Sequence, residues 1–457
     1  MTKYTRQHPP TPWRDTHDLS RFDTDKRYQE PFSRSHWPKN GFLDDFISHT
    51  LGRETTNFFA FWTAIVGVSG VIQRDAFLRF GEEGMFANFF TILVAEPAIA
   101  HKSTAMSLFN RVEGKALEKL QLSDFPLYNR KANKVINGKA TAEAMFDAMS
   151  NRTFTDHDGT IQKTNANLIL KVSELEVLLS RANYQNNLVG RLTDFYDCKD
   201  RDTDNTRGGG EKAIENIFSS LFACTTPTAI TNGSIPPEAF GGGFMSRCVI
   251  VRQKPEDIHR IIPIPLIFPD CPDSEEMAKR LNWIMENKIG EYALSPDGYK
   301  FYETWYTEEI TELRRKAVHG ETDSRDNRKT LQILKLAFML KLQEYSTDRM
   351  VTVDNLKQAI AIYNFTHEQA SELVEDVAMS GNADGRLLKL RAIVKKAGRD
   401  GVLRRDLSRK HRFKKFELDQ YIAEFKEREE IKEIVKTTEQ KTSNGTPKKE
   451  KVWLWIG

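Results

Sequence analysis

The sequence predicts an α/β fold with a separate basic module at its carboxyl end, on the basis of three observations. Apolar segments that suit buried strands alternate with helical stretches between about residues 85 and 260, which is the pattern of a sheet covered by helices. Directly after one of these strands, a lysine and a serine open a helix. From residue 381 onward, 21 lysines and arginines stand against 12 aspartates and glutamates, a net charge of about +9 in a chain whose total is +3.

Length and composition indicate a folded cytoplasmic protein. At 457 residues the chain is long enough for roughly two or three domains, and its 28 phenylalanines are ample for their cores. No run approaches the roughly 18 consecutive apolar residues of a membrane span, and the first residues lack an apolar signal region. The cysteines are Cys198, Cys224, Cys248 and Cys271. Because they form no pair at zinc or redox spacing, we expect buried thiols. The lack of a long apolar run predicts no contact with a membrane.

Composition divides the chain into five parts. Residues 1–38 are polar and rich in proline, arginine and aspartate, and they predict an extended arm that either wraps a neighbouring subunit or moves freely. Residues 39–84 suit two helices that pack on a core. The alternating α/β region spans 85–270, and the pattern over 271–380 is helical throughout, as in a lid or collar. Residues 381–457 form the basic module.

The expected elements follow from apolar periodicity. Strands are expected at 89–94, 168–172, 217–224 and 248–252, with helices at 103–120 and 141–150, and in the lid at 331–342 and 353–365. The polar segment 200–210 predicts a flexible loop.

The segment from Phe86 to Thr104 has the layout of a phosphate-binding P-loop: a buried strand, a short turn and a helix. In a P-loop, backbone N–H groups at a helix amino terminus cradle phosphates, a lysine reaches the β- and γ-phosphates, and a serine or threonine hydroxyl holds Mg²⁺. We therefore expect ATP and Mg²⁺ as cofactors. The expected binding residues are Ala98, Ala100, His101, Lys102, Ser103 and Thr104, with Ser103 on the metal.

The glycines of this motif are missing. The pattern G-x-x-x-x-G-K-[ST] would have glycine at the positions of Glu96 and His101, where glycine lets the backbone approach phosphate closely. An ordinary turn between a strand and a helix is therefore the alternative interpretation.

An ATPase also needs acidic and polar groups at the ends of neighbouring strands. The strand from Asn167 ends in Ser173 and Glu174, and we expect Glu174 to polarise the attacking water and to complete the Mg²⁺ site. Ser173 stands where an aspartate commonly holds the metal shell, and a solvated glutamate is the alternative. The strand from Ile217 ends in Thr225 and Thr226, which can sense a γ-phosphate.

An arginine follows a glycine-rich segment at the entry of the last strand. Arg247 comes after Gly241, Gly242 and Gly243. In a ring-forming ATPase, an arginine at this position reaches the nucleotide of the neighbouring subunit and stabilises transferred charge. The alternative is a local ion pair.

The basic module predicts a winged helix, because its expected order is three helices followed by a two-stranded wing. Its predicted DNA-binding residues are Arg404, Arg405, Arg409, Lys410, Arg412, Lys414 and Lys415, with Lys448 and Lys449 directly after the hairpin tip expected over 437–447. Positive side chains in this arrangement suit the phosphate backbone of DNA. A winged helix can also mediate protein contacts.

The motifs, in this order, resemble those of the primase/helicase-like P-loop ATPases of phages and mobile elements. The resemblance covers about residues 42–365. It rests on Glu54 with Phe61-Trp62, Asn88, Lys102-Ser103-Thr104, Ser173-Glu174-Leu175, Tyr196-Asp197, Thr226-Pro227, Gly242-Gly243-Phe244-x-Ser246-Arg247, and Arg328 with Leu334-Lys335-Leu336-Ala337. It implies a RecA/AAA+-type core, similar to superfamily 3 viral helicases, that assembles as a ring around DNA, and we expect a hexamer. Arg325 or Arg328, in the lid, is expected to contact nucleotide of the same subunit.

Two functions remain open on this basis. The first is a ring-forming, ATP-dependent DNA helicase that replicates a phage or mobile element in a bacterial host, on single- and double-stranded DNA and with host or phage replication proteins. The second is a DNA-binding initiator or helicase loader with slow or no ATP turnover, which the missing glycines and Ser173 favour. A primase is less favoured, because zinc-ribbon cysteines and a separate acidic trio are missing from the sequence.

Overall fold

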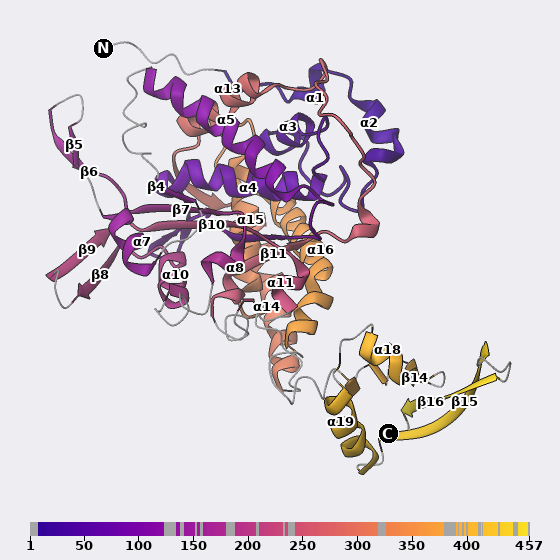
Figure 1. Cartoon of the computed structure of the whole chain (residues 1–457). Coiled ribbons are helices and arrows are strands. Elements are labelled where there is room, and N and C mark those ends of the chain that lie inside the picture. Colours follow the sequence, from indigo (N-terminus) through magenta and orange to yellow (C-terminus); the bar gives the residue numbers. More distant parts are fainter. Residues whose placement is uncertain are drawn as a thin grey trace. The chain divides into compact units, whose positions relative to one another are not determined.

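The structure is a computed structural model of the chain (Figure 1). It describes residues 8–122, 134–137, 141–150, 153–155, 159–179, 188–206, 210–231, 234–235, 243–318, 326–378, 390–391, 393–394, 397–398, 401–409, 413, 415–427, 430–441 and 447–455. The chain divides into two compact units, Met1–Glu372 and Leu373–Gly457.

A five-stranded parallel sheet forms the centre of the first unit. Its strands lie in the order β11–β3–β10–β7–β4. They are β3 (Phe90–Val94), β4 (Lys134–Asn137), β7 (Asn167–Val172), β10 (Phe218–Thr225) and β11 (Cys248–Arg252). Every residue of β3, β7 and β10 is buried, as expected for parallel strands covered on both faces. The four predicted strands are confirmed, and β4 is added.

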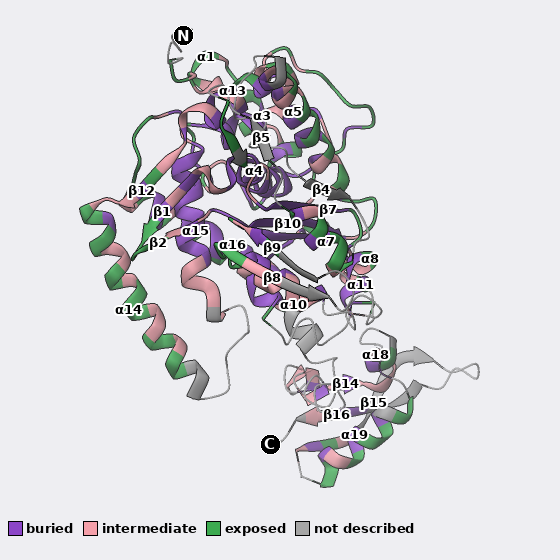
Figure 2. Cartoon of the chain, turned by 90° about the vertical axis from the view of Figure 1, so that its left-hand side faces the viewer, coloured by how far each residue is buried: buried purple, intermediate pink, exposed green. Residues whose placement is uncertain are grey.

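Helices cover both faces of this sheet. On one face α4 (Asn57–Ile72) packs against β3, β10 and β11, and α5 (Lys102–Leu122) packs against α4. The other face is covered by α7 (Ala142–Met149), α8 (Leu175–Leu178) and α10 (Leu188–Tyr196), as Figures 1 and 2 show. The helix α4 is buried at almost every position, which explains why its sequence is apolar on all sides. The Thr56 hydroxyl caps the amino terminus of α4 by accepting a hydrogen bond from the Phe59 N–H.

The first unit also contains a second sheet of four strands, in the order β13–β12–β1–β2. Its strands come from two parts of the chain, around residues 39–84 and 271–380, where only helices were expected. It consists of β1 (Ala76–Phe80), β2 (Glu83–Met85), β12 (Gly290–Leu294) and β13 (Met350–Val351). Strands of two to five residues are too short for a period of two to be recognised. The helices of the expected lid are α13 (Ser274–Asn287), α14 (Pro296–Val318), α15 (Lys329–Leu342) and α16 (Val353–Ala378).

The predicted flexible loop at 200–210 is wrong. Strands β8 (Arg201–Thr206) and β9 (Gly210–Glu215) pair as an antiparallel hairpin. The loop was predicted because aspartate and asparagine are disfavoured in strands. The segment is nevertheless a strand, because its backbone forms hydrogen bonds with the segment that follows it. A smaller hairpin joins β5 (Thr153–Thr155) and β6 (Ile161–Lys163).

The described part of the expected amino-terminal arm, from residue 8 to residue 38, packs on its own chain instead of extending away. It contains the short helices α1 (Trp13–Thr16) and α2 (Ser20–Thr24). The side chains of Phe32 and Trp37 are buried in the main core together with α3 (Phe42–His49) and α4. A few aromatic anchors therefore hold a segment whose overall composition is polar.

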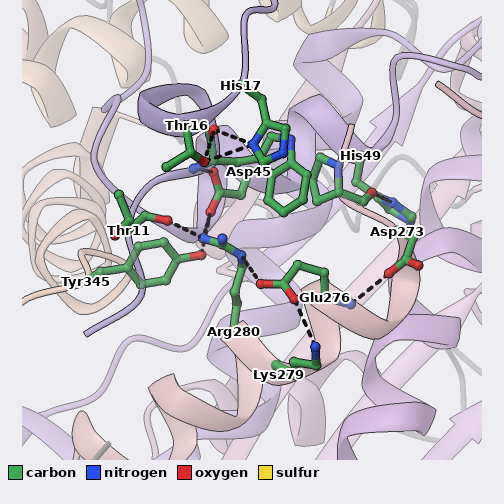
Figure 3. Close-up of polar contacts among 12 residues, drawn as sticks. Thr11, Thr16, His17, Asp45, His49, Asp273, Glu276, Lys279, Arg280 and Tyr345 are labelled. Carbon is green, nitrogen blue, oxygen red and sulfur yellow. Dashed lines mark hydrogen bonds and ion pairs between the residues drawn. The ribbon is translucent and has the colours of Figure 1, made fainter. Parts of the chain in front are cut away.

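A buried carboxylate fixes this segment to the core (Figure 3). Asp45, in α3, accepts hydrogen bonds from the Trp13 backbone N–H at 2.8 Å, from Arg280 Nη1 at 2.6 Å and from the Tyr345 hydroxyl at 2.8 Å. The same Arg280 nitrogen donates to the Thr11 carbonyl at 2.8 Å. Four separate parts of the chain thus meet at one side chain.

The described residues of the second unit agree with the predicted order in part, because two helices precede a hairpin, whereas a third strand, β14, was not expected. A three-stranded antiparallel sheet, in the order β14–β16–β15, contains β14 (Val402–Leu403), β15 (Ile431–Lys441) and β16 (Pro447–Trp455). Helices α18 (Arg404–Arg409) and α19 (Lys415–Glu427) precede the hairpin. Their core contains Leu390, Val394, Leu407, Leu418, Phe425 and Trp453. Strand β15 continues to Lys441 and β16 begins at Pro447, so both strands extend into the range 437–447 that was expected to be the hairpin tip.

Candidate active site

The carboxyl ends of three parallel strands bring three of the predicted motifs to one edge of the sheet. Strand β10 lies between β3 and β7, with Thr225 opposite Val94 and Ala223 opposite Val172. The loop after β3, the threonines that end β10 and the acidic segment after β7 therefore meet there. Ligands of open parallel sheets bind outside the carboxyl ends of the strands, so this edge is the candidate active site.

The loop after β3 has a backbone conformation that glycine normally supplies. Ala98 has φ +60° and His101 has φ +45°, which is the left-handed region. Adopting it costs a residue with a Cβ roughly 1–2 kcal/mol. His101 stands at the second glycine position of the P-loop pattern, whereas Glu96, at the first, has no positive φ. The chain thus keeps a left-handed turn before Lys102 without the glycine.

Lys102 opens α5 and folds back over the loop. Its Nζ donates a hydrogen bond to the Ala95 carbonyl at 2.8 Å. Burial lowers the pKa of Lys102, while the nearby Cys224, Glu96 and Glu176 oppose that shift. The next residue, Ser103, is exposed. A cationic side chain and an accessible hydroxyl thus lie at the amino terminus of a 21-residue helix, where the helix dipole favours anions.

The His101 side chain ties this loop to two other segments. Its Nε2 lies 2.8 Å from the Glu54 carboxylate, and the other oxygen of Glu54 accepts a hydrogen bond from the Ile262 backbone N–H at 2.8 Å. Glu54 lies just before α4, and Ile262 follows β11. The strained loop is therefore held by a contact from outside it.

The acidic residue that joins the site is Glu176, which sequence reasoning missed. The Thr225 hydroxyl donates to Glu176 Oε2 at 3.0 Å, and Glu176 also acts on the pKa of Lys102. The predicted Glu174 is instead exposed at the start of α8 and forms no capping hydrogen bond. The repeat Ser-Glu-Leu-Glu after a buried strand was the available signal, because it offers two acids at the same strand end.

The two threonines separate in role. Thr225 is 3% exposed and contacts Glu176. The Thr226 hydroxyl accepts a hydrogen bond from the Ala229 N–H at 3.1 Å, which caps α11 (Pro227–Thr231). Only Thr225 therefore belongs to the cluster around Lys102.

Arg247 and Arg328 lie at the opposite edge of the sheet. Arg247 immediately precedes β11, at the amino end of the strands, and pairs with Asp197 at 2.7 Å. Arg328 contacts the same carboxylate at 3.4 Å. The five residues of β3 span about 16 Å and lie between this end of the sheet and the end from which the loop leads to Lys102. The structure thus places Arg328 beside Arg247 and not, as expected, with the nucleotide loop of its own chain; Arg325 lies outside the described residues.

Comparison with models of protein families and with curated proteins finds no match. The choice of ligand therefore depends on the chemistry of these side chains. Among the residues that the structure describes, no group of three or more histidine, cysteine or acidic side chains could hold a metal ion. Mg²⁺ in nucleotide sites is bound through one or two protein oxygens and the phosphates, so the Ser103 hydroxyl fits that mode.

Few of the predicted DNA-binding side chains fall within the described residues of the second unit. Arg404 Nη2 donates to Asp419 at 2.5 Å and to the Lys415 carbonyl at 3.2 Å, while the Lys415 side chain is exposed. Arg405 is partly exposed. Lys410, Arg412 and Lys414 lie outside the described residues, as do the side chains of Arg409, Lys448 and Lys449. None of the described helices is long and apolar enough to cross a membrane.

Proposed function

We propose that this protein is an ATP-dependent DNA helicase whose copies assemble in a ring, with ATP and Mg²⁺ bound at the carboxyl ends of β3, β10 and β7. The observation that carries the proposal is the loop after β3. It keeps a left-handed turn at His101 directly before Lys102 and Ser103, although His101 carries a side chain that strains this conformation. An ordinary turn between a strand and a helix has no need of such strain.

The site residues have complementary tasks in ATP hydrolysis. Lys102 leaves the Ala95 carbonyl, 2.8 Å from its Nζ, and pairs with the β- and γ-phosphates, while the Ser103 hydroxyl is a ligand of Mg²⁺. Bound Mg²⁺ supplies charge neutralisation at the phosphates. Glu176, held by the Thr225 hydroxyl, orients and polarises the attacking water. Thr225 thus connects Glu176 to β10, the strand that lies between β3 and β7.

Arg247 has its task at a second copy of the chain. It lies at the amino ends of the strands, whereas its own Lys102 loop follows the carboxyl end of β3, a strand of about 16 Å. Arg247 therefore suits a nucleotide bound by a neighbour. A head-to-tail contact of this kind closes into a ring when its rotation permits, and we propose a hexamer. The second unit, with β14, α18, α19 and the hairpin β15–β16, is proposed to be a winged helix that binds DNA.

The second candidate is a DNA-binding initiator or helicase loader whose core binds nucleotide with slow or no turnover. Glu96 favours it, because its negative charge acts on Lys102 and opposes a triphosphate there. The lack of glycine at positions 96 and 101, and a serine in place of an aspartate at position 173, favour it as well.

Steady-state ATP hydrolysis by the full chain, with and without single-stranded DNA, tests the proposal. We expect DNA-stimulated turnover that falls at least roughly 100-fold in Lys102→Ala. Arg315→Ala is the matched control, since Arg315 pairs with Glu312 on the surface of α14. Nucleotide binding without turnover would favour the initiator or loader, and no nucleotide binding would refute both.

A further inference from the structure

The amino-terminal segment, residues 8–39, encloses a pocket of about 340 Å³ together with the core helices. Residues between Arg14 and Lys39 form most of its wall. Ile47 of α3, Leu51, and Asn57 of α4 form the rest. The lining includes none of the side chains around Lys102, so the pocket is separate from the candidate active site. Its volume falls in the range of small-ligand sites.

Three cationic side chains line this pocket against one carboxylate. The cations are Arg14, Arg34 and Lys39, and the carboxylate is Asp23. Behind the wall, Asp44 is completely buried and lies 3.8 Å from Arg14 Nε and 3.5 Å from Arg34 Nη2. The two acids leave one positive charge in excess among these side chains, and an excess of this sign favours an anion.

The outer cations have hydrogen-bond donors that the two acids do not use. Arg14 is engaged, because its Nη1 donates to both oxygens of Asp23 at 3.1 and 3.0 Å. Arg34 Nη1 instead lies 3.9 Å from Asp23, which is beyond hydrogen-bond distance, and the Arg34 side chain is 31% exposed. Lys39 is exposed and pairs with no carboxylate of the described residues. Arg34 and Lys39 can therefore both donate to a ligand in the pocket.

The floor of the pocket is apolar. Its side chains are buried, and they are Phe22, Tyr28, Trp37, Ile47 and Leu51. Trp37 is fixed there because its Nε1 donates to Asp44 at 2.8 Å. Phe22 packs edge-on against Tyr28, with 5.0 Å between the ring centres. A ligand that fills the pocket thus contacts cations and apolar side chains together, which an inorganic anion alone cannot do.

We propose that this pocket binds a small organic anion. Its carboxylate or phosphate group contacts Arg34 and Lys39, and its apolar body covers the floor. Either group presents oxygens that match the fork of a guanidinium group. Because the wall consists of the amino-terminal segment and of α3, the bound ligand joins that segment to the core. The inference is independent of the proposed function, since it needs no nucleotide at the Lys102 loop.

Isothermal titration calorimetry of the full chain with phenyl phosphate, benzoate and inorganic phosphate tests this proposal. We expect at least one of the organic probes to bind at least roughly tenfold more tightly than inorganic phosphate, because only the organic probes cover the apolar floor.

Variants of the lining identify the pocket as the place of binding. Arg34→Gln and Lys39→Gln should each weaken binding of the organic probe at least roughly fivefold. Asp23→Asn should strengthen it, because a competing negative charge is removed. The matched controls are Lys26→Gln and Arg27→Gln, at exposed positions of the same segment outside the pocket lining, and they should leave the affinity unchanged. Thermal melting checks that each variant folds.

The comparison of probes shows which anionic group the pocket takes. Tighter binding of phenyl phosphate indicates a phosphate ester, tighter binding of benzoate indicates a carboxylate, and either result supports the proposal. No binding of either organic probe up to about 10 mM overturns it. Unchanged affinity in both Arg34→Gln and Lys39→Gln also overturns it, as does inorganic phosphate that binds as tightly as the organic probes. Binding that is lost in Lys102→Ala would place the anion at the loop after β3 and overturn the assignment to this pocket.

Discussion

His101 Nε2 lies 2.8 Å from the Glu54 carboxylate, and this contact anchors a loop whose backbone is strained. The φ angles of Ala98 and His101, +60° and +45°, fall in the region that favours glycine. The anchor and the strain together indicate that the surrounding structure holds the loop in a conformation that its own residues do not prefer.

Glycine at position 98 is expected to stabilise the protein. Ala98→Gly removes the left-handed penalty and should raise the free energy of unfolding by about 1 kcal/mol. Ala100→Gly, two residues away, is the matched control. Ala100 is buried and has no positive φ, so this change should lower that free energy by about 0.5–1 kcal/mol. Denaturant titration of both variants measures the difference, and equal effects would contradict the strain.

If the protein hydrolyses ATP as proposed, two glutamates at the end of β7 are expected to differ sharply in their effect on ATP turnover. Glu176→Gln should lower ATP turnover at least roughly 100-fold, because Glu176 contacts Thr225 and acts on Lys102. Glu174→Gln should change it less than about threefold, because Glu174 is exposed at the start of α8. Steady-state hydrolysis at saturating ATP compares the two. The reverse order would return the role of base to Glu174.

The elements that were predicted correctly are those with a hydrophobic pattern within one short stretch of sequence. Strands β3, β7, β10 and β11 are apolar runs because both faces of a parallel sheet are buried. The second sheet was missed because its strands are short and pair across large sequence distances, as β1 does with β12. The amino-terminal segment was misjudged because its polar composition hides the buried Phe32 and Trp37.

The sequence predicted which strand ends form the candidate site, but it did not predict which side chains contact one another there. Sequence order placed Lys102 and the acids after neighbouring strands, which is a topological property. Which acid turns inward depends on the short helix α8 and on Thr225 of another strand. The position of Arg328 depends on where α15 packs, because its partner Asp197 lies 131 residues earlier in the chain. Neither contact has a signature in local sequence.

Lys415 is expected to contribute one phosphate contact if the second unit binds DNA. Its side chain is exposed at the start of α19, whereas Arg404 is engaged by Asp419. Lys415→Ala should therefore weaken binding to duplexes of any sequence and lower the slope of log affinity against log salt by about 1. Arg404→Ala should have the smaller effect. Fluorescence anisotropy over a range of salt concentrations measures both, and an unchanged slope for Lys415→Ala would exclude that contact.

The buried pair of Glu30 and Arg260 is expected to make stability depend on pH. Glu30 Oε1 accepts a hydrogen bond from Arg260 Nη2 at 3.0 Å, and Glu30 Oε2 accepts one from the Asn57 N–H at 2.7 Å. Burial nevertheless raises the pKa of Glu30 from 4.5 to about 7. Between these values the folded protein binds more protons than the unfolded chain, so the free energy of unfolding falls as pH rises.

The contribution of Glu30 is therefore fully present below about pH 4.5 and is lost as pH rises through about 7. Glu30→Gln keeps the shape of the side chain and removes its titration, so it should flatten the fall in melting temperature over this interval. Glu312→Gln, an exposed partner of Arg315, is the control and should leave the slope as it is. An equally steep slope in Glu30→Gln would mean that the carboxylate stays ionised beside Arg260 throughout.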